Sequence, residues 1–184
     1  MLFRSKKKCK ECIINYNNDF LKQLFDYIIL LNNDKNFRFI FTGNIVYDFY
    51  KNIDLKKNTI IDKVLKQKEN IINIPVISIL LTKKMISGKH IDSNIYNKEY
   101  DSIITNYITK FVDFFKKRYD NISIEYNCKK DYLYYCVSIK NNDEYIFNIF
   151  IGSLNECYSY TQYKNFYLIS IDRFLSTSLL TLLL

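Results

Sequence analysis

A short apolar strand that runs through a single glycine into a helix constrains this fold more than any other stretch. Residues 37–51, FRFIFTGNIVYDFYK, begin with an aromatic and β-branched run typical of a buried strand. Gly43 is one of only 3 glycines, which predicts a positive φ or a close approach at this junction. Two interpretations stay open: a phosphate or nucleotide on the N–H groups around Thr42, Gly43 and Asn44, or a tight strand-to-helix corner.

The patterns on either side predict an α+β fold, a mixed and largely antiparallel sheet packed by helices. Apolar residues recur at helical spacing in three further segments, namely 17–31, a solvent-facing part of 52–73, and 101–119. Apolar or alternating runs predict the other strands, namely 74–81, 122–127, 132–140, 145–151 and 166–171. Residues 141–144 have the composition of a hairpin loop, and the strands 37–41 and 74–81 are expected to lie side by side. Residues 83–100 lack a pattern and are predicted to form a long loop.

The predicted organisation is one domain, residues 17–171, between a basic N-terminal arm (1–16) and an apolar C-terminal helix (172–184). With 184 residues, 48% of them apolar, the chain can bury a core. No apolar run approaches the roughly 20 residues of a membrane span, so none is predicted. The leucine-rich end favours burial, self-association through residues 174–184, or continuation into a longer protein.

Charge and cysteine content leave several partners open. The net charge of +8 fits either nucleic-acid binding or a solvated basic surface. Five cysteines without a secretory signal predict free thiols in a reducing, cytoplasmic compartment. Cys9 and Cys12 have the spacing of half a zinc site, but the other half is missing and His90 is the single histidine. We therefore predict no metal site, no cofactor and no histidine-based triad.

The order of these elements resembles the core of the nucleotidyltransferase superfamily, in particular the poly(A) polymerase-like proteins of large DNA viruses. In that family a glycine turn supports the nucleotide phosphates, and carboxylates on later strands hold two Mg²⁺ ions. Thr42, Gly43 and Asn44 match the glycine turn, and Asn148 stands where the third carboxylate is expected. The strand 74–81 holds no acid. The resemblance implies a copy without catalytic residues.

A second resemblance concerns the same turn. Phe41, Thr42 and Gly43 are similar to the motif of the MTG-motif gene family of insect poxviruses, whose members carry Met at the first position. This similarity implies a viral protein of the host-cell cytoplasm, and it supplies no catalytic residue.

Three functional hypotheses follow from these observations. The first is a non-catalytic nucleotidyltransferase-like viral module that binds a protein partner or RNA through the glycine turn and Asn148. The second is an active Mg²⁺-dependent nucleotidyltransferase with displaced carboxylates, whose candidates are Asp54, Asp62 and Glu125. The third is an RNA-binding accessory protein in which Tyr132 and Tyr134 stack on bases.

Overall fold

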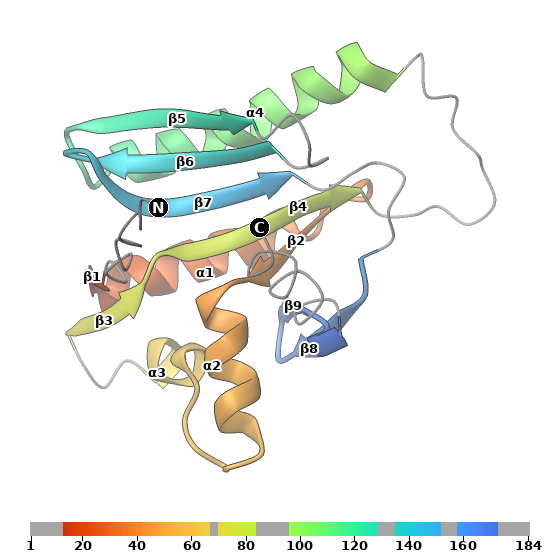
Figure 1. Cartoon of the computed structure of the whole chain (residues 1–184). Helices are drawn as coiled ribbons and strands as arrows, with labels where there is room; N and C mark the ends of the chain where they lie inside the picture. Colours follow the sequence, from red (N-terminus) through yellow and green to blue (C-terminus); the bar gives the residue numbers. More distant parts are fainter. Residues whose placement is uncertain (1–12, 67–69, 84–95, 129–134, 152–157, 173–184) are drawn as a thin grey trace, which may run out of the picture.

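The computed structural model describes residues 13–66, 70–83, 96–128, 135–151 and 158–172. These residues form the predicted mixed α+β architecture, a mostly antiparallel sheet packed by helices (Figure 1). The helices are α1 (Asn18–Leu31), α2 (Asn44–Ile53), α3 (Ile60–Lys66) and α4 (Tyr96–Lys116). The strands are β1 (Ile13–Asn17), β2 (Phe37–Thr42), β3 (Ile71–Pro75), β4 (Ile77–Lys83), β5 (Ile122–Cys128), β6 (Tyr135–Asn141), β7 (Glu144–Ile151), β8 (Tyr160–Tyr163) and β9 (Phe166–Ile169).

These strands form two sheets. The larger sheet has the order β5-β6-β7-β4-β2-β9-β8, and β1 pairs with β3 in a separate two-stranded sheet. The pairs β4–β7 and β2–β9 are parallel, and the other pairs are antiparallel. The predicted contact between the first two apolar strands is confirmed, because β2 and β4 pair from Phe37 opposite Lys83 to Thr42 opposite Ser78.

The predicted hairpin is also confirmed. Strands β6 and β7 pair antiparallel on either side of Asn142 and Asp143, whose φ values are 48° and 66°. Two consecutive positive φ values are typical of the tight turns whose twist matches that of paired strands. Strand β7 then lies beside β4, so the hairpin extends the central sheet.

Asparagine side chains fix both ends of α1. The Oδ1 of Asn17 accepts a hydrogen bond from the N–H of Phe20 at 3.2 Å, which caps the first turn. Beyond the helix, the Asn32 side chain donates to the Phe39 carbonyl at 3.1 Å and accepts from the Phe39 N–H at 2.8 Å. These bonds connect the end of α1 directly to β2.

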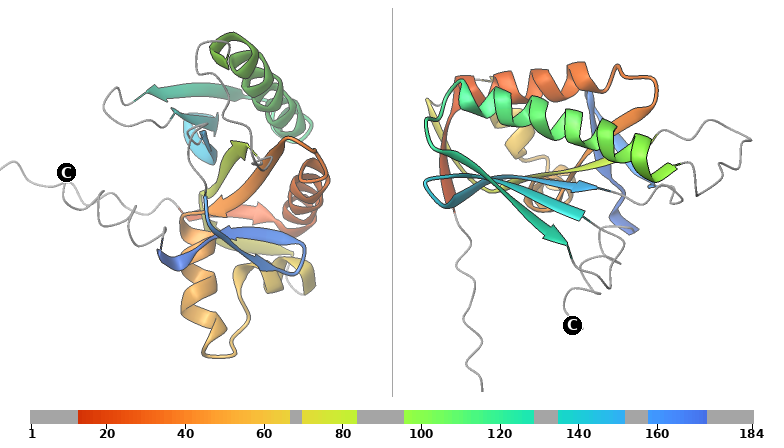
Figure 2. Two further views of the ribbon diagram at one scale, coloured as in Figure 1. Left: turned by 90° about the vertical axis from the view of Figure 1, so that its right-hand side faces the viewer. Right: turned by 90° about the horizontal axis from the view of Figure 1, so that it is seen from above.

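Helices α1 and α4 run side by side over one face of the large sheet (Figure 2). The layer between them and the sheet is aromatic. The ring of Phe111 on α4 lies 5.6 Å from that of Tyr27, 5.9 Å from that of Phe39 and 5.2 Å from that of Phe147. Phe111 is fully buried, so this ring joins α1, α4, β2 and β7 in one core.

In the segment 52–81 one prediction is confirmed in part and one is wrong. The helix expected within 52–73 is present as the short helix α3, but it is not simply solvent-facing, because its Ile61 and Val64 are fully buried. The single strand expected at 74–81 is divided between β3 and β4, which pair in different sheets. The division follows Pro75, which has no N–H to donate to a ladder.

Several boundaries also differ from the prediction. Residues 13–16, assigned to the basic arm, form most of β1. Helix α4 begins at Tyr96, inside the predicted loop 83–100. Residues 132–134, with Tyr132 and Tyr134, and residues 173–184 of the apolar C-terminal helix lie outside the described residues.

Candidate binding site

The site begins at Gly43, which joins β2 to α2. Its φ of 63° and ψ of −135° confirm the expected positive φ, a conformation that residues with a Cβ rarely adopt. A Cβ built at this position would lie 3.5 Å from the Cβ of Ser78, an ordinary contact distance. The backbone conformation therefore requires glycine here, whereas the space around this position would accept a side chain. Gly43 also provides no side chain to cap α2.

This geometry gives a stability prediction. We expect Gly43→Ala to lower the free energy of unfolding by about 1–3 kcal/mol, the cost of holding a residue with a Cβ in a sparsely populated backbone region. Denaturant titration followed by circular dichroism measures the change. Asn44→Ala is the control, because Asn44 lies within helix α2. Equal stability of Gly43→Ala and the wild type would contradict the assigned strain.

A row of polar residues crosses the sheet beside Gly43. The strand register places Thr42 opposite Ser78, Ser78 opposite Asn148, Asn148 opposite Ser138, and Ser138 opposite Glu125. Residues directly opposite each other point to the same face of a sheet. We call these five residues the polar row. It lies on the sheet face turned away from α1 and α4, because Phe41, Ile79 and Phe147, which alternate with its members, belong to the core.

The centre of the polar row has unused hydrogen-bonding capacity. The Nδ2 of Asn148 donates to the Oγ of Ser78 over a long 3.5 Å, and the buried Oδ1 of Asn148 has no partner. Ser78 and Ser138 are buried on either side, at 7% and 3% exposure. Buried polar atoms are normally paired, so this unpaired acceptor sets the centre of the row apart from the rest of the sheet.

The candidate carboxylates of the sequence analysis do not come together in the described part of the chain. Asp62 hydrogen-bonds Thr59, Tyr163 and Lys164, whereas Asp54 is exposed just beyond the end of α2. Glu125 belongs to the polar row, but it forms an ion pair with Lys140 and accepts from the Tyr145 hydroxyl at 3.1 Å. Within the described ranges no three His, Cys, Asp or Glu side chains group as metal ligands would.

The Asp62 network is structural. Thr59 and Asp62 form a capping box at the start of α3, with the Thr59 N–H donating to Asp62 at 3.0 Å and the Asp62 N–H donating to the Thr59 hydroxyl at 3.1 Å. Tyr163 and Lys164 from the end of β8 donate to the same carboxylate. Burial alone would raise the pKa of Asp62, but the hydrogen bonds from Lys164, Thr59 and Tyr163 outweigh it and lower this pKa to about 2.

Arg38 and two tyrosines form a second polar group on the same face of the sheet. Arg38 precedes Thr42 by four residues on β2, so both side chains point the same way. Its guanidinium carbon lies 4.3 Å from the ring centroid of Tyr160 and 4.5 Å from that of Tyr167. The Nε of Arg38 is buried without a hydrogen-bond partner, and no acidic residue of the described part pairs with this cation. The cluster combines a fixed cation with exposed aromatic surface.

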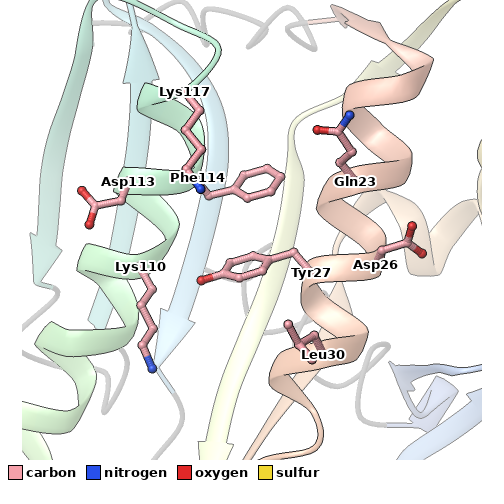
Figure 3. Close-up of a pocket in the computed structure, with 8 residues that line it drawn as sticks. All are labelled: Gln23, Asp26, Tyr27, Leu30, Lys110, Asp113, Phe114 and Lys117. Carbon is pink, nitrogen blue, oxygen red and sulfur yellow. The ribbon is translucent and has the colours of Figure 1, made fainter.

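A groove on the opposite side of the molecule lies between α1 and α4. Tyr27 and Phe114 extend toward each other from the two helices and stack at 4.9 Å, which fills its floor (Figure 3). Its charges balance, with Asp26 on α1 facing Asp113, Lys110 and Lys117 on α4 or directly after it. This groove is therefore distinct from the polar row, because it lies on the other side of the molecule and its charges cancel.

The structure brings together some of the predicted site residues and adds others. Thr42, Gly43 and Asn148 meet around Ser78, and Asn44 begins the helix beside them. Sequence analysis missed Ser138 and Arg38. Ser138 could have been found by its place on the polar side of an alternating strand, but its partner Asn148 depends on a register that the sequence does not specify.

Comparisons with known proteins do not extend this description. In the described part of the chain no helix is long and apolar enough to cross a membrane. The chain matches no protein-family model, and neither the curated proteins nor the solved structures gave a match.

Proposed function

We propose that this chain is a non-catalytic, nucleotidyltransferase-like module that binds a partner through the polar row and the glycine turn. The observation that carries the proposal is the chemistry of the row. Thr42, Ser78, Asn148 and Ser138 are neutral donors and acceptors on adjacent strands. A two-metal transferase needs carboxylates in such a place, because hard divalent cations are held by charged oxygen ligands.

The surroundings of the row support binding. The glycine turn presents the uncapped start of α2 next to Ser78. Backbone N–H groups at a helix start attract anionic groups. Phosphate, carboxylate or carbonyl oxygens of a partner are therefore the groups that fit this corner.

A transfer assay tests the non-catalytic proposal. The purified protein is incubated with labelled nucleoside triphosphates, an RNA primer, and Mg²⁺ or Mn²⁺. We expect no metal-dependent incorporation, because Asp62 and Glu125 lie in structural hydrogen bonds and ion pairs and Asp54 is exposed after the end of α2. Incorporation that Glu125→Gln abolishes would contradict the proposal, since Glu125 is the one acid of the row.

RNA is a second candidate function, favoured by the Arg38 cluster. Arginine and tyrosine side chains are the groups on which single-stranded bases stack, and a cation beside them attracts the phosphate backbone. Tyr160 is 40% exposed and so remains available for stacking. The net charge of +8 favours the same partner.

A binding measurement tests the RNA candidate. We expect a labelled single-stranded RNA to bind at about 0.2 M salt, because stacking persists when counterion release is weakened. Tyr160→Ala should weaken binding about tenfold, since one stacked base contributes about 1–3 kcal/mol. Fluorescence anisotropy measures both effects.

Tyr47→Ala is the matched control for this measurement. Tyr47 is 55% exposed and has Lys51 at 5.6 Å from its ring, but it lies on α2. Its removal should leave the affinity unchanged. An equal loss in both variants, or binding that vanishes at 0.2 M salt, would show nonspecific attraction to a basic surface.

A further inference from the structure

Within the described residues, the outer edge of β5 lacks the devices that usually protect an edge strand. β5 ends the order of the large sheet and is 7 residues long, whereas β8 at the other end has 4. Natural edges are blunted by shortness, proline, bulges or charge. β5 contains no proline, its pairing with β6 has no break in register, and the charge of Glu125 is balanced by Lys140.

The free backbone groups of this edge belong to alternate residues. The N–H of Asn142 donates to the carbonyl of Asn121 at 3.3 Å, and these residues are directly opposite when the β5–β6 register is extended by one pair. In an antiparallel ladder such bonded pairs alternate with unbonded ones. Ser123 and Glu125 therefore point their backbone groups toward β6, whereas Ile122, Ile124 and Tyr126 point theirs outward.

Two of these residues have exposed, largely apolar side chains. Ile124 is 38% exposed and Tyr126 is 64% exposed, whereas Ile122 is partly buried against the core. Ile124 and Tyr126 lie opposite Ile139 and Val137, which belong to the core under the helices. No strand of the described part pairs with this edge, which thus offers backbone hydrogen-bonding groups together with an apolar strip that continues the core outward.

We propose that a second copy of this chain pairs with β5, so that two sheets join edge to edge in an antiparallel twofold dimer. The register follows from the strand itself. Pairing centred on Ile124 places Ile124 opposite its symmetry mate, and Ile122 opposite Tyr126. The backbone groups of Ile122, Ile124 and Tyr126 then form hydrogen bonds with the other copy, and their side chains meet on one face of the joined sheet.

The charges of β5 favour the same register. Centring on Ile124 places each Glu125 opposite a Ser123 of the other copy. A shift to a centre on Glu125 would place two carboxylates directly opposite each other, which is unfavourable. We choose a second copy as the occupant of this edge because β5 can pair with itself in this register. A twofold contact, in which both copies use the same surface, needs a patch that is complementary to itself.

Sedimentation and light scattering test the dimer. We expect the full chain to move from its 22.2 kDa monomer mass to twice that mass as its concentration rises. Ile124→Lys and Tyr126→Lys should keep the protein monomeric, because a charge on the apolar strip opposes pairing. Ile71→Lys is the matched control, because Ile71 is 60% exposed on β3 in the other sheet.

Amide exchange identifies the contact without any substitution. In the concentrated protein the N–H groups of Ile122, Ile124 and Tyr126 should exchange more slowly than in the dilute protein, while those of Ser123 and Glu125 are slow in both. A chain that stays monomeric overturns the proposal. A dimer that survives both lysine variants, or one that protects amides elsewhere and leaves this edge unchanged, overturns it as well.

Discussion

Replacing Phe111 with alanine should lower the free energy of unfolding by about 3–5 kcal/mol, the largest single effect we expect in this protein. Phe111 is fully buried and its ring contacts those of Tyr27, Phe39 and Phe147. The substitution removes apolar contacts from α4 to helix α1 and to two strands, and leaves a cavity among rigid rings. Denaturant titration measures the loss.

Leu30→Ala is the control for this prediction. Leu30 is 61% exposed on α1, so its truncation should change the stability by less than about 0.5 kcal/mol. Similar losses in the two variants would show that Phe111 is not at the centre of the core.

Asp62→Asn should lower the free energy of unfolding by about 2 kcal/mol near neutral pH. The carboxylate accepts hydrogen bonds from Thr59, Tyr163 and Lys164, and the folded protein lowers its pKa from 3.8 to about 2. The pKa of Asp62 is lower in the folded protein than in the unfolded chain. The contribution of this carboxylate to the free energy of unfolding is therefore complete above pH 3.8 and is lost as the pH falls toward 2. The difference between wild type and variant should therefore shrink in acid.

The measurement is a set of unfolding curves between neutral pH and pH 2 for both proteins. Asp54→Asn serves as control, because Asp54 is exposed and lies outside this network. A stability difference that stays constant across the acid range would mean that the Asp62 carboxylate does not carry the effect.

Local signals were enough to predict the strand, glycine turn and helix around Gly43 and the hairpin before Glu144. In these places the hydrophobic period, the turn residues and the pairing agree. Strand β1 was missed because its sequence, IINYN, has only 5 residues and runs directly into helix α1. It is held by pairing with β3, a long-range contact that leaves no local signal.

The binding site was predicted only in part, because it also depends on long-range strand pairing. The scarcity of glycine identified Gly43, and the resemblance to the nucleotidyltransferases pointed to Asn148 as the position of an expected carboxylate. The polar row depends on which strands become neighbours and in what register, and a shift of one residue would move Asn148 to the other face. The Arg38 cluster required the pairing of β2 with β9, which is separated from it by most of the chain.

The most direct test of the four neutral residues of the polar row is a Mn²⁺ titration of isotope-labelled protein, without nucleotide, followed through its amide signals. A bound paramagnetic ion broadens the signals of the residues around it. Our account predicts no selective broadening at Gly43, Ser78 or Asn148, because their side chains and backbone carry no negative charge. Saturable broadening confined to these three signals would contradict it and would place a divalent ion at the row.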